Sequence, residues 1–159
     1  MADLSANVIH KTRGSTRQSA PIANGVTLYE GALVGWEGGY ANHWADGAND
    51  VFAGIVLGAG IGIAPGAALL GNTSATPIPE VQIDTSGVTL MHLDSIDGTP
   101  TQAKVGDIVY GVSSNTDDLD LTAVTANNTP VGWLSYFRSA TDSDVTLFTP
   151  SEFLAYVGT

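Results

Sequence analysis

The three histidines are the side chains of this sequence best suited to metal or acid–base chemistry, but they stand far apart. His10, His43 and His92 fall in three different segments, and none has a partner at metal-ligand spacing. His43 lies beside Trp44 and near Asp46, a combination that suits surface recognition, although a polar loop is the commoner setting for such a histidine. The chain contains no cysteine, which excludes disulfides, thiolate metal sites and cysteine nucleophiles. We therefore expect no metal site.

Carboxylates gather at Asp117, Asp118 and Asp120, and oxygen-rich loops of this kind hold calcium in some proteins. The residues that follow, TAVTANN, supply neither the further ligands nor the central glycine and distal glutamate of an EF-hand. A solvated turn is therefore the favoured interpretation. A hydrolase whose carboxylates come together from distant loops is the remaining enzymatic alternative.

Two motifs associated with catalysis or cofactors are incomplete or missing. The stretch GAGIG at 58–62 resembles a dinucleotide-binding loop, but Ile63 stands where the third glycine belongs and Pro65 opposes a helix there. No G-x-S-x-G sequence, the mark of one class of serine nucleophile, occurs in the chain. We therefore interpret the sequence as that of a protein with no catalytic residues, no cofactor and no enzymatic activity.

Charge is distributed very unevenly along the chain. Residues 1–17 carry Lys11, Arg13, Arg17 and one acidic residue, Asp3, for a net charge of +2. The remaining two basic and fifteen acidic residues give the rest of the chain a net charge of −13. An acidic body repels the phosphates of DNA and RNA, so we expect no nucleic-acid partner. Residues 1–17 therefore carry a net charge opposite in sign to that of the rest of the chain.

The elements that position these residues are predicted to be short strands joined by turns. With 159 residues, 19 of them glycine, the chain suits one β-rich domain, expected over 21–159, preceded by an extended amino-terminal arm over 1–20. Apolar or alternating runs predict strands around 26–29, 32–36, 51–58, 79–84, 87–93, 107–112, 130–137 and 144–149, with a polar loop over 41–50. The fold class is mostly β, a small antiparallel barrel or sandwich, tulip-like or jelly-roll-like, with strand order left open.

Two capping patterns predict short helical turns. Thr99, Pro100 and Gln102 occupy the positions of a capping box, and Thr149, Pro150 and Glu152 repeat it near the carboxyl terminus. The second pattern predicts a helix over about 150–157. Residues 51–79 carry no charge, but their glycines and prolines interrupt them too often for a membrane-spanning helix, so no membrane association is expected.

Tryptophans are the remaining candidates for contacts. We expect Trp36, Trp44 and Trp133 to contribute to contacts with other subunits, since large aromatic side chains anchor interfaces. The uncharged, glycine-rich middle of the chain is expected to provide further self-contacts, because backbones approach closely there. The alternative is a carbohydrate-binding β-module on a virion or cell surface, with Trp44 and His43 forming an exposed platform.

Residues 98–137 carry a family resemblance. Thr101, Ala103, Val105, Gly106, Val109 and Tyr110 form a Thr-x-Ala-x-Val-Gly-x-x-Val-Tyr stretch, and a polar hairpin and the strand start Pro130, Val131, Gly132 follow. This segment resembles the carboxyl-terminal half of the capsid decoration, or cement, proteins of tailed bacteriophages, and the resemblance extends over about 30–138. The chain departs from that pattern at 59–80, which looks inserted, and at 150–159, which is additional.

The resemblance implies a structural part of the virion. Such proteins are made in the host cytoplasm and bind the outer surface of the expanded head, across junctions of the major capsid protein, as homotrimers or in some phages dimers. They stabilise the shell without catalysis. On such a capsid the amino-terminal arm is expected to bind a neighbouring subunit. Its basic residues would pair with capsid carboxylates, and its apolar residues would lie in a groove of the capsid surface. The residues expected to do so are Leu4, Val8, Ile9, Lys11, Arg13 and Arg17; the alternative is a disordered tail without a role.

Overall fold

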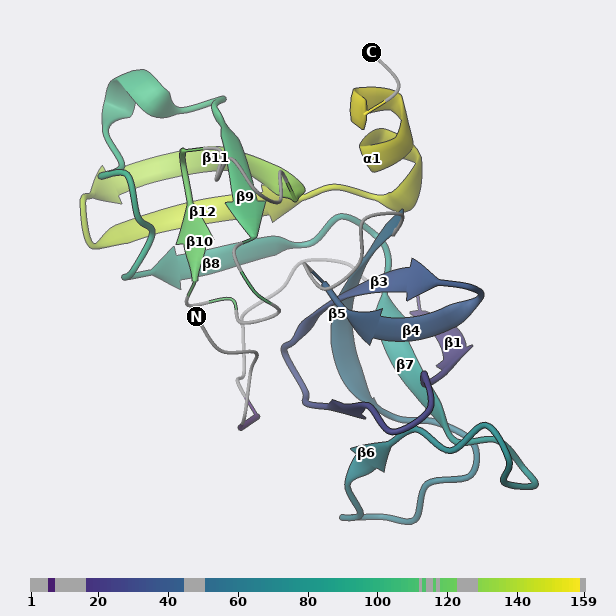
Figure 1. Cartoon of the computed structure of the whole chain (residues 1–159). Helices are drawn as coiled ribbons and strands as arrows, with labels where there is room; N and C mark the ends of the chain where they lie inside the picture. The colour runs from purple at the N-terminus through teal and green to yellow at the C-terminus, as the bar shows by residue number, and fades with distance from the viewer. Residues whose placement is uncertain are drawn as a thin grey trace.

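The computed structural model describes residues 6–7, 17–44, 51–111, 113, 116, 118–122 and 129–157 of the chain. Two five-stranded antiparallel sheets and a two-stranded ribbon make up the body (Figure 1). The first sheet contains, in spatial order, β1 (Arg17–Pro21), β7 (Glu80–Asp84), β5 (Val51–Ala59), β3 (Leu33–Glu37) and β4 (Tyr40–His43). The second contains β10 (Leu119–Asp120), β9 (Ile108–Gly111), β11 (Pro130–Ser139), β12 (Asp142–Leu147) and β8 (Thr89–Leu93).

The ribbon pairs β2 (Thr27–Leu28) with β6 (Leu69–Leu70). Two short helical elements complete the body: the 3-10 turn η1 (Gln102–Lys104) and the helix α1 (Pro150–Val157). The predicted mostly β architecture with a carboxyl-terminal helix is confirmed. Among the alternatives left open by the sequence, a closed barrel is not detected in the described part of the chain.

Strands β3 and β5 are buried on both faces, which explains their nearly continuous apolar sequences. Leu33, Phe52 and Ile55 face an inter-sheet core shared with the second sheet, whereas neighbouring residues face the opposite side. That opposite side is a ribbon-side core, in which Val34 and Val56 pack with residues of β1, β7 and the ribbon. The first sheet is therefore the central layer of the molecule.

The edges of the first sheet approach each other at one point. Ile22, just after β1, forms a parallel bridge with Ala41 of β4, and the Ala23 N–H donates to the Ala41 carbonyl at 2.9 Å. The expected amino-terminal arm ended at residue 20, but β1 begins at Arg17 and pairs along β7. Arg17 is consequently the first residue of the sheet.

The capping box at the carboxyl terminus forms as predicted. The Glu152 N–H donates to the Thr149 hydroxyl at 3.1 Å, and the Thr149 N–H donates to the Glu152 carboxylate at 3.4 Å. Phe153 is the buried side chain of α1 and inserts into the inter-sheet core. Local sequence thus starts this helix, and one aromatic side chain attaches it to the body.

Two local expectations are corrected. Thr99 does not cap η1: it has a positive φ of 51°, and the residue before η1 is Thr101, which makes no side-chain cap bond. The polar loop expected over 41–50 begins later, because Tyr40–His43 form β4. Strands β7 and β8, adjacent in the chain, belong to different sheets, so the segment between them crosses from one sheet to the other.

Candidate functional site

Most of the predicted arm lies outside the described residues, including Leu4, Val8, Ile9, Lys11 and Arg13. Arg17 is described: its side chain is exposed at the start of β1, and no ion pair joins it to another described residue. The sheet therefore presents this guanidinium to solvent at one edge.

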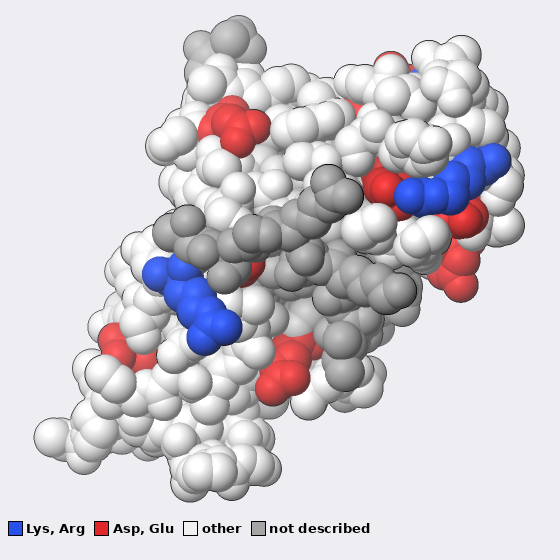
Figure 2. Space-filling view, turned by 180° about the vertical axis from the view of Figure 1, so that it is seen from behind, with Lys and Arg blue, Asp and Glu red and all other residues white. Residues whose placement is uncertain are grey.

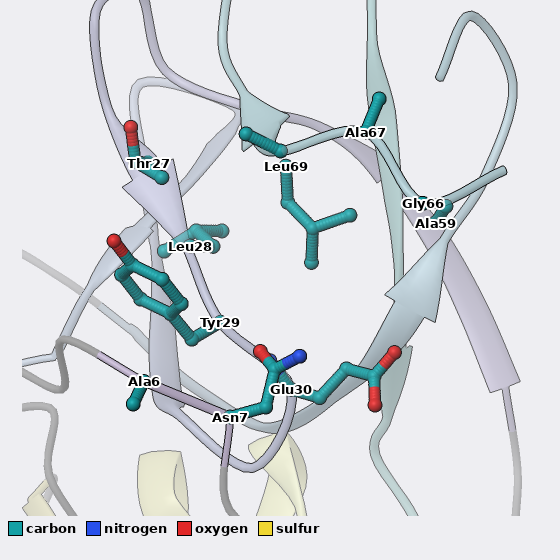
Figure 3. Close-up of a pocket in the computed structure, with 11 residues that line it drawn as sticks. Ala6, Asn7, Thr27, Leu28, Tyr29, Glu30, Ala59, Gly66, Ala67 and Leu69 are labelled. Carbon is teal, nitrogen blue, oxygen red and sulfur yellow. The ribbon is translucent and has the colours of Figure 1, made fainter. Parts of the chain in front are cut away.

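Ala6 and Asn7 are the described part of the chain before Arg17, and they lie against the body. The Glu30 N–H donates to the Asn7 side-chain oxygen at 3.1 Å. Both residues line a cavity of about 420 Å³ whose other walls are β2, the end of β5 and residues 66–69 (Figure 3). The Leu69 side chain points into this cavity, and Glu30 lies at its margin beside Asn7 (Figure 3). The amino-terminal segment thus meets the ribbon here.

Residues 60–79 form what we call the uncharged protrusion, because this stretch contains no Asp, Glu, Lys or Arg. In Figure 1 it surrounds β6 and extends away from the second sheet. Ile61 is 60% exposed and Leu70 is 47% exposed, although both are large aliphatic residues. A chain of net charge −11 therefore presents an uncharged surface with exposed apolar side chains at one end. Surfaces of this kind mark interaction sites when they are contiguous.

The three tryptophans differ sharply in position. Trp44 is only 2% exposed, and its ring packs edge-on against Phe52 and Phe153 at centroid distances of 5.2 and 5.3 Å. A Cβ at Gly35 would lie 2.6 Å from this ring and one at Gly111 3.1 Å, so glycines of both sheets make room for it. The expectation that Trp44 contacts other subunits, or forms a surface platform with His43, is therefore wrong.

Trp36 and Trp133 remain partly exposed, at the margins of the two cores. Trp36, in β3, packs against the ribbon-side core, and Trp133, in β11, packs against the inter-sheet core with its ring 5.8 Å from that of Phe148. Each therefore offers part of its ring to solvent. These positions are compatible with the predicted contacts but do not test them.

The described basic side chains do not form a continuous positive face. The Lys104 ammonium donates to the carbonyls of Gly98 and Thr99, and Arg138 pairs with Asp142 and Asp144. On the face seen in Figure 2, Lys and Arg appear as separate spots among acidic and uncharged residues. The described Lys and Arg side chains on this face do not form the basic stripe of a nucleic-acid-binding surface.

The residues first considered for chemistry do not assemble into a site. Asp120 accepts a hydrogen bond from the Thr122 N–H at 2.8 Å and Asp118 accepts one from the Ser113 hydroxyl at 2.9 Å, so both close local turns. Asp117 and His10 lie outside the described residues. Across the described ranges, no group of three or more His, Asp or Glu side chains is arranged to hold a metal ion. Nor does any helix in those ranges have the length and hydropathy needed to cross a membrane.

One cluster escaped sequence analysis. On the second sheet, His92 of β8 lies beside Asp142, and Arg138 of β11 bridges Asp142 and Asp144 of β12. His92 and Asp142 are 50 positions apart in the chain. Arg138, Asp142 and Asp144 lie close in the chain, on the hairpin of β11 and β12. His92 has no local spacing to them, because only the pairing of β8 with β12 brings it to this group.

Comparisons with known proteins do not assign a family. No protein-family model matches the chain, and no curated protein and no solved structure matches it. The resemblance of residues 98–137 to capsid decoration proteins therefore stays a prediction, and a function has to be argued from the surfaces described above.

Proposed function

We propose that this protein is a decoration protein of a tailed-phage head, bound to the outer surface of the capsid across junctions of the major capsid protein. Its role is to stabilise the expanded shell, and it acts as a structural protein without catalysis. The motif of residues 98–137 supports this proposal, as does a body made of antiparallel sheets.

The observation that carries the proposal is the meeting of two contact features at one end of the body. The amino-terminal pair Ala6 and Asn7 and residues 66–69 of the uncharged protrusion line the same cavity. Residues 6–7 of the arm and the uncharged protrusion therefore lie side by side, and we infer that both contact the same neighbouring capsid subunit. Elsewhere an acidic body faces solvent, which keeps the protein soluble and limits contacts with other acidic surfaces.

The contacts follow from the chemistry of the two features. Apolar side chains of the protrusion, Ile61 and Leu70, leave water when they dock on the shell, and uncharged backbone there carries no charge-desolvation cost. Lys11, Arg13 and Arg17 pair with carboxylates of a neighbouring capsid subunit. A homotrimer, or a dimer in the alternative arrangement, multiplies these modest contacts, because linked binding segments raise the overall affinity by orders of magnitude.

Binding to stripped heads tests the proposal. Expanded tailed-phage heads freed of their own decoration protein are mixed with the full-length chain, and occupancy is measured by co-sedimentation and cryo-electron microscopy. We expect binding to the outer surface and greater resistance of the heads to heating. Light scattering coupled to size-exclusion chromatography gives the number of chains in the free protein.

The double variant Ile61→Asp, Leu70→Asp should weaken binding by about tenfold or more, because carboxylates would be buried at the contact. A matched control is Leu154→Asp, Val157→Asp on α1, whose side chains are 51% and 50% exposed and lie away from the protrusion. Absence of any binding by the unmodified protein contradicts the proposed function. Equal loss in both double variants contradicts the assignment of the contact surface.

A further inference from the structure

A β-bulge in β8 redirects one side chain on the second sheet. Leu90 pairs with Val145 and Leu93 with Ser143, so Met91 and His92 together lie opposite the single residue Asp144. His92 has a positive φ of 57°, a conformation that non-glycine residues rarely adopt. Its N–H donates to the Asp144 carboxylate at 3.0 Å, and its Nδ1 lies 3.0 Å from Asp142 Oδ1. The bulge therefore turns the imidazole toward β12.

Arg138 forms hydrogen bonds with both carboxylates of this group. Its guanidinium donates to both oxygens of Asp144, at 2.6 and 3.0 Å, and to Asp142 Oδ1 at 3.3 Å. Bidentate pairing of this kind holds a guanidinium in one orientation. A guanidinium has five N–H donors, so donors remain for a ligand after these bonds are made. The two carboxylates and the guanidinium of this group together contribute a net charge of −1.

An exposed aromatic ring stands beside the charged group. Tyr136 is 56% exposed, and the guanidinium carbon of Arg138 lies 4.7 Å from the centre of its ring. Tyr136, Arg138 and Asp144 line a hollow of about 290 Å³, together with Thr89 and Met91. This volume is close to the lower limit, about 300 Å³, of sites that bind small organic molecules. One ring of a small ligand fits such a hollow.

We propose that this hollow binds a neutral saccharide. An exposed tyrosine ring offers an apolar face for the C–H groups of a sugar, and fixed donors and acceptors next to it suit vicinal hydroxyls. An anion such as phosphate would meet the carboxylate of Asp144, which lines the hollow, and a purely apolar ligand would displace water from Arg138 without replacing its hydrogen bonds. This site is independent of the uncharged protrusion and of the proposed shell contact, and it lies on the other sheet.

The fluorescently labelled full-length protein is applied to an array of defined oligosaccharides, and hits are measured by calorimetry. Tyr136→Ala should weaken binding by about tenfold, because the stacked ring is lost, whereas Tyr136→Phe should keep binding within about threefold. Arg138→Lys should also weaken saccharide binding, because lysine lacks the planar guanidinium and its several fixed N–H donors. Tyr156→Ala on α1, the same change at a tyrosine that is also exposed, serves as the control.

Circular dichroism of every variant establishes that the sheets are intact before affinities are compared. Failure of the unmodified protein to bind any sugar of the array overturns the proposal. So does binding that survives Tyr136→Ala, or that falls equally in Tyr156→Ala. None of these results bears on capsid binding, which is tested with variants of other residues.

Discussion

Replacement of Trp44 by alanine should weaken the packing between the two sheets, because this side chain belongs to the core that they share. The ring contacts Phe52 of β5 and Phe153 of α1, and it occupies space left by Gly35 of β3 and Gly111 of β9. Loss of a buried Trp or Phe side chain costs about 3–5 kcal/mol, because transfer energy is lost and a cavity remains. The two edge-on aromatic contacts contribute within that total, at about 0.5–1.5 kcal/mol each.

Urea unfolding followed by circular dichroism measures this loss. With a denaturant slope of about 2 kcal/mol per molar, a loss of 3–5 kcal/mol lowers the midpoint by about 2 M. Trp36→Ala is the matched control, and it should cost less because Trp36 is only partly buried. If Trp44→Ala does not fold, Trp44→Phe provides the measurement, with an intermediate loss expected because a smaller ring still reaches both neighbours. A loss below about 1 kcal/mol for Trp44→Ala, or one equal to that of the control, would refute the reasoning.

Three further predictions concern single positions. Thr149→Ala should lower the free energy of unfolding by about 1 kcal/mol, because the cap of α1 is lost, and a thermal melt that is unchanged would contradict this. Gly132→Ala should cost about 1–3 kcal/mol or more in urea unfolding, since its Cβ would lie 2.0 Å from the Thr146 carbonyl oxygen; a neutral effect would speak against the β11–β12 register. Arg138 holds the pKa of Asp144 below its ordinary value near 3.8, so the carboxylate stabilises the fold above about pH 4 and this contribution disappears as the pH falls through the lowered pKa. The melting-temperature difference between the unmodified protein and Asp144→Asn should accordingly be largest near neutral pH, and a difference that grows toward acid pH would overturn this assignment.

The proposed site shows the limits of local patterns. Arg17 was identified from its charge among few basic residues, and it lies exposed at the start of β1. The absence of charge over 51–79 was also identified from composition, and the protrusion at 60–79 is part of that stretch. The contact of Ala6 and Asn7 with residues 66–69 of the protrusion was not foreseen, since these segments are far apart in the chain and meet only around one cavity.

The sequence by itself determined what depends on neighbours within a few residues. The capping box of α1 joins positions three apart, and the strands of the pair β11 and β12 follow each other directly, so both appear in composition and spacing. The tertiary structure alone decided which side of each strand is inside. Trp44 has the amino-acid type of an interface anchor, but Gly35 and Gly111 of two different sheets create the space that buries it. His92 likewise joins Arg138 and Asp144 of the β11–β12 hairpin only because a bulge in β8 and the pairing of β8 with β12 bring it into contact with them. Burial and clustering are properties of packing between elements, and a one-dimensional pattern records only the preferences of each element alone.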